Sequence, residues 1–360
     1  MTTKGRGTTA GLALRDLSVR FLVGHGRRRG AAPTVVQAVN GVTLDLVPGR
    51  VLALVGESGC GKSVLAAAIL GLLPANAQVR GTVELADPAG GPPLDLLRCP
   101  ERVLAGSVRG RRVALVPQSA ATHLTPVRRV RGQLAETVRT LTGVRDKAAL
   151  RAHCDELAVR VGLAPADLDR FPHELSGGMA QRAALAFALV GEPEVVLADE
   201  PTAGLDRPLV RNTTAALRDL AGQGRAVLLI THDLAAAEDV ADDLAVMYAS
   251  RLVESGPAAA VLADPWHDYT RGLLAALPRN GLTPIPGQPP ELSRLPAGCA
   301  FHARVPGDCS GDPTARPVGD RRIACRPGVD AAVPVLSGAP AVPVLSGAPA
   351  ATNGGGDGTC

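Results

Sequence analysis

Residues 55–64 read VGESGCGKSV, and this stretch decides the fold. Its glycines let the backbone turn tightly with N–H groups pointing inward, so that they can cradle phosphates. Lysine occurs elsewhere only at Lys4 and Lys147, in a chain with 38 lysine and arginine residues. A compact ammonium on a thin stem can reach phosphates inside such a loop, whereas a planar guanidinium is too broad. The residues predicted to bind a nucleotide here are Gly56, Glu57, Ser58, Gly59, Cys60, Gly61, Lys62, Ser63 and Val64.

The segments that flank this loop have the patterns of strands and a helix. Residues 34–56 read as strands separated by the turn-forming pair Pro48-Gly49, and residues 63–73 have apolar residues at helical spacing. Strand, loop and helix in this order are the context that a phosphate-binding loop requires. Ser63 follows the lysine with a hydroxyl suited to Mg²⁺. The loop therefore predicts both a nucleotide and a metal ion.

A second motif begins with a short apolar run at residues 195–198, which reads as a buried strand and ends in Asp199 and Glu200. An aspartate at a strand tip can hold the Mg²⁺ shell, and the next carboxylate can orient or deprotonate an attacking water. Taken alone, the motif is also typical of a solvated strand end. Asp199 lies 137 residues after Lys62, far more than a crossover between neighbouring strands uses, so a further segment is inserted between them.

Composition limits the class of protein. With 360 residues, 46% of them hydrophobic, the chain can bury a core of one large or two ordinary domains. The net charge of +4 comes without basic blocks of the nucleic-acid-binding kind, so we expect no nucleic-acid partner. The N-terminus lacks the apolar region of a signal peptide, and the longest apolar run is about half of the ~20 residues that a membrane span needs. Any membrane role is expected to come through partners.

The inserted segment contains the stretch ELSGGMAQR at residues 174–182. It resembles the signature motif of ATP-binding-cassette (ABC) ATPases, which opens a helix. Ser176, Gly177 and Gly178 would present a hydroxyl, N–H groups and a helix N-terminus to a γ-phosphate. A serine before an apolar helix is also an ordinary helix cap, which is the alternative for this stretch taken alone.

Four further positions match the pattern of the same family. Gln118 looks like the glutamine that ligates Mg²⁺ and senses the γ-phosphate. His232 resembles the histidine that contacts the γ-phosphate and helps to position the water. Asp206 ends a stretch similar to the loop that communicates across the dimer, and Phe21 stands where the family places an aromatic ring on adenine. Each of these residues taken alone is more typical of ordinary structure, so the assignments depend on the resemblance.

The resemblance covers roughly residues 11–325 and implies an α/β fold. We expect the P-loop NTPase fold of ABC ATPases, with a mostly parallel core sheet, an antiparallel β subdomain and an inserted α-helical subdomain at residues 119–175. The resemblance also implies bound ATP with Mg²⁺, and catalysis by Glu200 and His232. The metal ligands that it implies are Ser63, Gln118 and Asp199.

Sequence features near the C-terminus narrow the subfamily. HDYTRGLLAALP at residues 267–278 and IPGQPPELSRLPAGCAFHARVPGDC at residues 285–309 look like the ATPase subunit of oligopeptide, dipeptide and nickel importers. The chain departs from that pattern at Ser119-Ala120 and at Ala180. These departures bear on the surface that contacts the membrane subunit more than on the chemistry.

We expect three regions along the chain. The ABC ATPase domain is predicted at residues 11–278, and an oligopeptide-transporter-type extension at residues 279–328. Residues 329–360, which contain AVPVLSGAP twice in tandem at 332–340 and 341–349, are expected to be a low-complexity, disordered tail.

The resemblance implies a peripheral transport ATPase at the cytoplasmic face of the cell membrane. It would power uptake of di- and oligopeptides through two integral membrane permease subunits, with an extracellular solute-binding protein involved indirectly. Since one phosphate-binding loop occurs here, a second ABC ATPase subunit, in this family usually a distinct companion chain, would complete the pair. Import of nickel or a metal chelate is the alternative, and a soluble non-transport ABC ATPase or an exporter ATPase is less favoured.

Seven cysteines are scattered along the chain, one of them inside the loop, which favours a reducing cytosol. Cys299, Cys309 and Cys325 lie near His302 in sequence, and three thiols with one imidazole could close a tetrahedral zinc site. An all-cysteine iron–sulfur site lacks a ligand. Free cytosolic thiols in a docking extension are the simpler interpretation, so we expect no cofactor beyond ATP and Mg²⁺.

Overall fold

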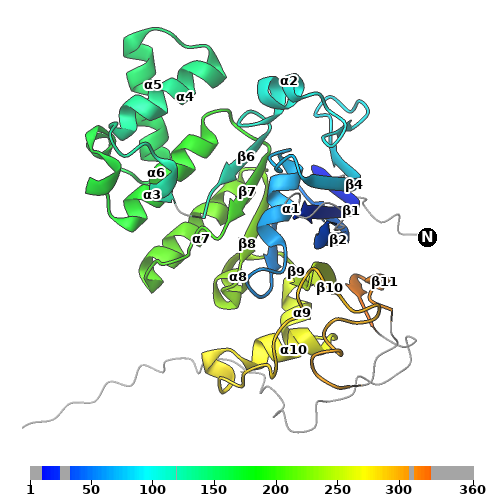
Figure 1. Ribbon diagram of the computed structural model, residues 1–360. Helices are drawn as coiled ribbons and strands as arrows, with labels where there is room; N and C mark the ends of the chain where they lie inside the picture. Colours follow the sequence, from blue (N-terminus) through cyan, green and yellow to red (C-terminus); the bar gives the residue numbers. More distant parts are fainter. Residues whose placement is uncertain (1–9, 25–32, 119, 308–311, 326–360) are drawn as a thin grey trace, which may run out of the picture.

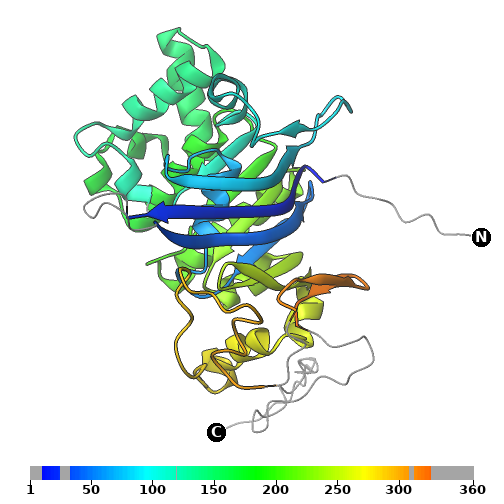
Figure 2. The ribbon, with the colours of Figure 1, turned by 45° about the vertical axis from the view of Figure 1, so that its right-hand side comes forward.

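Two β-sheets organise the residues that the computed structural model describes, which are 10–24, 33–118, 120–307 and 312–325. The strands form the middle of the molecule (Figure 1). The inserted helices α3 to α6 lie at one end and the C-terminal segment at the other, in both views (Figures 1 and 2). Within these described ranges, no helix has the length and apolar character that a membrane span requires.

The smaller sheet is antiparallel and has the strand order β2-β1-β4-β5. Its long strands alternate buried and exposed side chains, and the buried face packs on the core sheet through an apolar cluster that includes Leu12, Leu54 and Leu65. These strands lie across one side of the molecule in Figure 2. Their bounds are β1 (Leu12–Val23), β2 (Thr34–Leu46), β4 (Ala77–Leu85) and β5 (Leu94–Asp95).

The larger sheet has the order β11-β12-β10-β9-β3-β8-β7-β6. The five strands from β9 to β6 in this order are parallel, and the three at the other edge are antiparallel. The expected α/β fold with a mostly parallel core sheet and a separate antiparallel sheet is therefore confirmed. The strands are β3 (Val51–Val55), β6 (Val113–Val116), β7 (Val195–Asp199), β8 (Ala226–Thr231), β9 (Asp243–Tyr248), β10 (Arg251–Pro257), β11 (Arg316–Val318) and β12 (Arg321–Ile323).

Helices cover the core sheet. α1 begins at the phosphate-binding loop and buries Leu65 and Ile69, as the helical spacing of residues 63–73 predicts. A π-helical turn follows α2 without a break, and the sequence pattern gave no sign of it. The helices outside the inserted segment are α1 (Lys62–Ile69), α2 (Glu101–Val103), η1 (Leu104–Val108), α7 (Arg207–Gly222), α8 (Leu234–Val240), α9 (Ala258–Ala263), α10 (Asp268–Ala275) and η4 (Pro278–Asn280).

The inserted segment between β6 and β7 is helical, as expected. Leu134, Val138 and Leu157 pack into the same apolar cluster as residues of β6 and β7. Arg131 ties the helices together, since its guanidinium donates to Asp155, to Asp169 and to the Pro165 carbonyl. The bounds are α3 (Ala120–His123), α4 (Val130–Thr142), α5 (Lys147–Arg160), η2 (Pro165–Asp169), η3 (Pro172–Glu174) and α6 (Gly177–Leu189).

The C-terminal segment joins the core sheet. β12 pairs with β10, and the Ala324 N–H donates to the Val253 carbonyl at 2.9 Å. Arg321 is 6% exposed, and its guanidinium lies 4.3 Å from the centroid of the Trp266 ring. The expected extension thus has strands in the sheet of the expected ATPase domain. The expected tail at 329–360 lies outside the described residues.

Candidate functional site

The candidate residues meet at one edge of the core sheet. Since β3, β8, β7 and β6 are neighbouring parallel strands, the loops that follow them lie along the same carboxyl edge. The phosphate-binding loop follows β3, His232 follows β8, Asp199 and Glu200 end β7, and Gln118 follows β6. The sheet order therefore brings together motifs that are separated by up to 176 residues in the chain.

Two glycines of the phosphate-binding loop are required by close backbone approach. A Cβ on Gly56 would lie 2.1 Å from the Met247 carbonyl oxygen, and a Cβ on Gly61 would lie 1.9 Å from the Ala38 carbonyl oxygen. Gly61 also has a φ of +110°, which side chains rarely allow. The strands β9 and β2 thus press against the loop and fix its path.

Lys62 is 6% exposed and lies inside the loop. Its Nζ donates to the Gly56 carbonyl at 2.7 Å and to the Glu57 carbonyl at 3.1 Å. The Glu57 carboxylate pairs with Arg304 of the C-terminal segment, a partner that nothing near the loop in sequence indicates. Of the remaining predicted loop residues, Ser58 and Gly59 are exposed, Cys60 is buried and Val64 is half-buried.

Ser63 and Asp199, two of the predicted metal ligands, contact each other. The Ser63 Oγ donates to Asp199 Oδ1 at 3.0 Å. Burial raises the pKa of Asp199, and the charge of Glu200 adds to this, while the Ser63 hydrogen bond and the Lys62 charge oppose it. A hydroxyl and a carboxylate oxygen side by side are ligands that suit Mg²⁺. Ser63 is exposed, so the pair is open to solvent.

Glu200 and His232, the predicted catalytic residues, are joined by a hydrogen bond. Glu200 Oε2 lies 2.8 Å from His232 Nδ1 and also accepts from the His232 N–H at 3.3 Å. Glu200 is 7% exposed and has a φ of +47°, a left-handed conformation that is strained for a residue other than glycine. Its N–H continues the ladder of the sheet by donating to the Ile230 carbonyl at 2.8 Å. The carboxylate is therefore held in place by β8 and by the histidine.

Two predicted binding residues lie at the margin of this arrangement. Gln118 is exposed and lies two residues beyond the end of β6, the strand that pairs with β7. Phe21 is half-buried in β1 and packs against the apolar cluster under the smaller sheet. A metal contact of Gln118 and an adenine contact of Phe21 stay predictions.

The signature-like stretch opens α6. The Ser176 Oγ accepts a hydrogen bond from the Met179 N–H at 3.3 Å, so the serine is the helix cap. Ser176 and Gly177 are exposed, whereas Gly178 is buried against Leu209. Asp206 caps α7 in the same way, since its Oδ1 accepts from the Leu209 N–H at 3.0 Å. The exposed Ser176 and Gly177 thus place the start of α6 at the surface, where its N-terminal dipole faces solvent.

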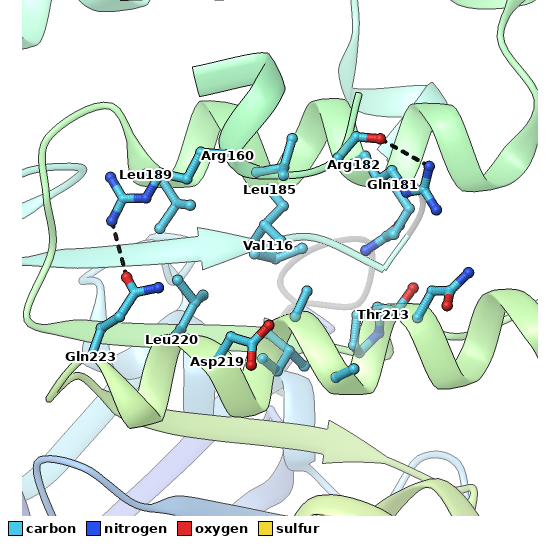
Figure 3. Close-up of a pocket in the computed structure, with 17 residues that line it drawn as sticks. Val116, Arg160, Gln181, Arg182, Leu185, Leu189, Thr213, Asp219, Leu220 and Gln223 are labelled. Carbon is cyan, nitrogen blue, oxygen red and sulfur yellow. Dashed lines mark hydrogen bonds between the residues drawn. The ribbon is translucent and has the colours of Figure 1, made fainter. Parts of the chain in front are cut away.

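A hollow of 340 Å³ lies beside this helix, between α6, α7 and β6 (Figure 3). Arg182 donates to the Gly162 carbonyl at its rim, and Arg160 donates to Gln223. The Gln181 Nε2 is buried there without a hydrogen-bond partner among the described residues. None of the predicted nucleotide or metal ligands lines this hollow.

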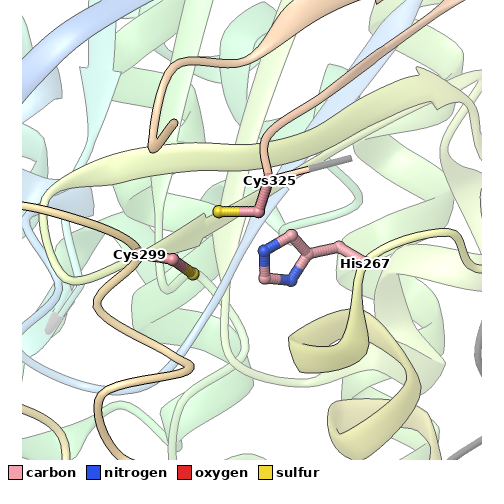
Figure 4. A group of neighbouring side chains, drawn as sticks. All are labelled: His267, Cys299 and Cys325. Carbon is pink, nitrogen blue, oxygen red and sulfur yellow. The ribbon is translucent and has the colours of Figure 1, made fainter. Parts of the chain in front are cut away.

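The described part of the cysteine cluster includes a histidine that sequence reasoning missed. The side chains of His267, Cys299 and Cys325 are buried, with potential ligand atoms within 4.8 Å of one another (Figure 4). His302, the histidine expected there, also lies beside Cys299, with 3.3 Å between Nδ1 and Sγ, and its Nε2 lies 2.9 Å from Asp268 Oδ2. The sequence feature that could have pointed to His267 is its position at the start of the HDYT stretch, which belongs to the family-like C-terminal pattern.

The tautomer of His267 bears on a metal ion at this cluster. Its Nδ1 accepts from the Tyr269 N–H at 3.0 Å, which leaves Nε2 as the protonated nitrogen of the neutral ring. Polar contacts with Cys325, and then with His267 and His302, hold the pKa of the Cys299 thiol below its usual range although burial opposes them. The Nε2 of His267 is buried and has no hydrogen-bond partner among the described residues, and it could ligate an ion only after losing its proton. Cys309 lies outside the described residues, and the expectation of no further cofactor stays a prediction.

Two protein-family models match the chain. The model described as "ABC transporter" matches residues 39–203, and the model described as "Oligopeptide/dipeptide transporter, C-terminal region" matches residues 253–308. The first match covers the phosphate-binding loop, the inserted helices and Glu200. The second covers α10 and the cysteine at 299.

Curated relatives and solved structures agree with these matches. The chain is 39% identical over 305 residues to the dipeptide transport ATP-binding protein DppD of Bacillus subtilis, which covers 82% of this chain and 86% of the relative. The chain is also 39% identical over 330 residues to the oligopeptide transport ATP-binding protein OppD of Mycobacterium tuberculosis. This alignment covers 87% of the chain and about half (51%) of the relative. The dimeric ATP-binding cassette MJ0796 bound to ADP and Pi has a similar fold, with a TM-score of 0.58 and 21% identity over 69% of this chain and 98% of that structure.

Proposed function

The chain belongs to the ABC transporter family as an ATP-binding ATPase subunit, and from this premise we propose that it powers import of dipeptides and oligopeptides through membrane permease partners. The observation that carries the substrate class is the match of residues 253–308 to the C-terminal region of oligopeptide/dipeptide transporters. The alternatives of nickel or chelate import, export, or a soluble non-transport role are not favoured by these matches.

In this proposal, Lys62 and the inward N–H groups of the loop bind the β- and γ-phosphates of ATP. Ser63, Asp199 and Gln118 would hold Mg²⁺, which neutralises charge on the phosphates when it is bound. The contact between Ser63 and Asp199 supports that assignment. Phe21 would stack on the adenine.

Glu200 takes the role of general base in the proposed hydrolysis. Its carboxylate would accept a proton from the attacking water, while His232 orients the carboxylate and contacts the γ-phosphate. The hydrogen bond between Glu200 Oε2 and His232 Nδ1 supports this pairing. The strained backbone at Glu200 is consistent with a carboxylate whose direction is fixed in advance.

We further propose that two cassettes close on ATP, each phosphate-binding loop facing the other chain's signature motif. Ser176 and Gly177 would meet the γ-phosphate bound by a companion ATPase chain, and Asp206 lies in the loop that would communicate between the two chains. Contacts to the γ-phosphate favour the closed pair, and hydrolysis removes them. The permeases would convert opening and closing into alternating access, at the cytoplasmic face of the membrane.

The test is uptake by the reconstituted complex of this chain, its companion ATPase and the permeases, with and without a solute-binding protein. We expect ATP-dependent uptake of labelled dipeptides or oligopeptides, and no uptake of nickel ions or a nickel chelate. ATP-dependent uptake of nickel with no uptake of peptide would contradict the proposed substrate. ATP hydrolysis that no substrate stimulates would contradict the transport role.

A further inference from the structure

Arg304 connects the C-terminal segment to the phosphate-binding loop. Its side chain is 6% exposed, and Nη1 donates to both carboxylate oxygens of Glu57, at 3.0 and 3.1 Å. The two residues are separated by 247 positions in the chain. The Glu57 side chain is 26% exposed, so this ion pair is shielded from solvent far more than a surface pair.

The rest of the guanidinium is occupied by backbone carbonyls. Nε donates to the Pro286 carbonyl at 2.8 Å, and Nη2 donates to the Ile285 and Gly287 carbonyls at 3.2 and 3.1 Å. These carbonyls belong to the proline-rich stretch that precedes Cys299. Since the planar fork of an arginine is needed to reach all of them and Glu57 at once, a lysine could replace only part of the set. Arg304 therefore has a fixed position from which to hold Glu57.

Glu57 is held on its main chain as well. Its N–H donates to the Tyr269 hydroxyl at 2.9 Å, and its carbonyl accepts from Lys62 Nζ at 3.1 Å. Tyr269 is fully buried, and its ring lies against the ring of Tyr248 at a tilt of 44° with 4.4 Å between centroids. Glu57 thus contacts the C-terminal segment through its side chain, α10 through its N–H, and the phosphate-binding lysine through its carbonyl.

We propose that Arg304 is a positioning residue for the nucleotide site: through Glu57 it fixes the backbone that sets the place of Lys62. The inference rests on the proposed role of residues 56–63 as the nucleotide site. In this role Arg304 acts through Glu57 and needs no contact of its own with the nucleotide. Without it, the Glu57 carboxylate loses its partner and the start of the loop can rotate, so that the Glu57 carbonyl and the lysine no longer keep one arrangement. In this proposal, the C-terminal segment contributes to the affinity for ATP through Arg304.

The experiment compares full-length variants by titration with a fluorescent ATP analogue and Mg²⁺, alongside thermal unfolding without nucleotide. We expect Arg304→Ala to weaken analogue binding about tenfold, corresponding to the loss of roughly one charged hydrogen-bonded contact. Arg304→Lys should lie between the wild type and the alanine variant, because its ammonium can reach Glu57 but not the three carbonyls as well. In the assembled transporter, Arg304→Ala should raise the KM for ATP more than it lowers kcat.

A double-variant cycle separates positioning from a general loss of stability. If Arg304 acts through Glu57, the variant with both Glu57→Ala and Arg304→Ala should bind the analogue within about twofold of Glu57→Ala alone. Arg316→Ala is the matched control, since it breaks an ion pair to Asp312 in the same segment at 75% exposure and should leave binding unchanged. If Arg304→Ala does not fold, Glu57→Gln and Tyr269→Phe decide the question, and each should weaken binding severalfold.

The outcomes are distinguishable. A folded Arg304→Ala with wild-type affinity, or effects of Arg304→Ala and Glu57→Ala that simply multiply, would overturn the inference and leave the proposed function standing. Wild-type affinity in both Glu57→Gln and Tyr269→Phe would do the same. A wild-type chain that binds no analogue would overturn the proposed function, and this inference with it.

Discussion

The backbone around Lys62 encloses its ammonium group closely and leaves little room for a larger head group. Its Nζ already donates to the Gly56 and Glu57 carbonyls, and the backbones of β2 and β9 close around the loop. We expect Lys62→Ala and Lys62→Arg both to abolish ATP hydrolysis, the first through loss of the phosphate charge and the second because a guanidinium cannot fit. Steady-state ATPase assays of the assembled transporter measure this. Turnover near the wild-type rate for Lys62→Arg would show that the steric argument is wrong.

Glu200 can be tested separately from the metal ligands. A carboxamide in Glu200→Gln keeps the shape of the side chain but cannot take a proton from water, and Asp199 and Ser63 are untouched. We expect ATP binding to persist while hydrolysis slows on the order of 10²-fold or more. Glu238→Gln, an exposed glutamate of α8, is the control and should leave the rate unchanged. If Glu200→Gln hydrolyses at the wild-type rate, the general base is another residue.

At this scale the sequence predicts local motifs well and distant contacts badly. Lys62, Ser63 and Glu200 belong to short patterns whose chemistry is legible without a fold, and the structure places them on one edge. The contact of Glu57 with Arg304 spans 247 residues, and the place of His267 beside Cys299 depends on how α10 docks. No spacing rule links such residues, because their proximity is a product of packing.

Among the elements, the helices α4 and α5 and the turn η2 depend on Arg131. Its guanidinium donates to Asp155 and Asp169, and the hydrogen bond to Arg131 lowers the pKa of Asp169. A carboxylate whose folded pKa is depressed adds stability that is present above its unfolded pKa of about 4 and is lost as the pH falls through the folded value. Arg131→Ala should therefore lower the free energy of unfolding by about 1–2 kcal/mol at pH 7, since solvent screens the 43%-exposed Asp169 side chain.

This difference should shrink as the pH falls below about 4, because the unfolded chain then binds a proton at Asp169 and, at still lower pH, the folded wild type does so too. Denaturant unfolding at several pH values measures it. Arg151→Ala is the matched control, since its guanidinium lies 4.0 Å from Asp169 and is 64% exposed. A deficit of Arg131→Ala that stays constant down to pH 3 would contradict an electrostatic origin.

Elements with a continuous apolar run were predictable from the sequence, and elements without such a pattern were not. The apolar runs of β3, β7 and β8 and the turn at Pro48-Gly49 follow from local pattern. The hairpin of β11 and β12 has three residues in each strand and four arginine or proline residues among the six, and it forms because β10 offers an open edge. The π-turn at Leu104–Val108 likewise gives no pattern of its own. Such elements are stabilised by pairing with distant parts of the chain, and the local sequence pattern does not indicate that pairing.

At the scale of the whole molecule, the paired-cassette proposal makes Gly177 the residue to change. A Cβ on Gly177 would meet only the tip of the Leu205 side chain, at 3.3 Å, whereas a Cβ on Gly178 would lie 2.6 Å from Leu209. Gly177→Asp should therefore fold, since an acidic residue in the first turn is also favourable for α6. It places a carboxylate where the companion's γ-phosphate would dock, and repulsion should prevent closure.

We expect the lone Gly177→Asp chain to bind an ATP analogue within about twofold of the wild type, while ATPase activity of the assembled transporter falls by at least about tenfold. Gly222→Asp, at the exposed end of α7, is a control for an added charge. If binding by the lone chain collapses instead, residues 175–178 act within their own chain or hold the fold, and the two-chain arrangement loses its support.

The sheet order also governs how this protein is made. β3 ends at Val55, but its neighbours β8 and β9 begin at Ala226 and Asp243, so both are translated about 170 to 190 residues later. At ordinary synthesis rates this is a delay on the order of 10–40 s, during which the five apolar residues of β3 have neither flanking strand. The edge of β10, which ends at Pro257, then stays open for a further 64 residues, until β12 at residues 321–323 leaves the ribosome. A nascent chain released early therefore carries the complete phosphate-loop sequence and has no nucleotide site.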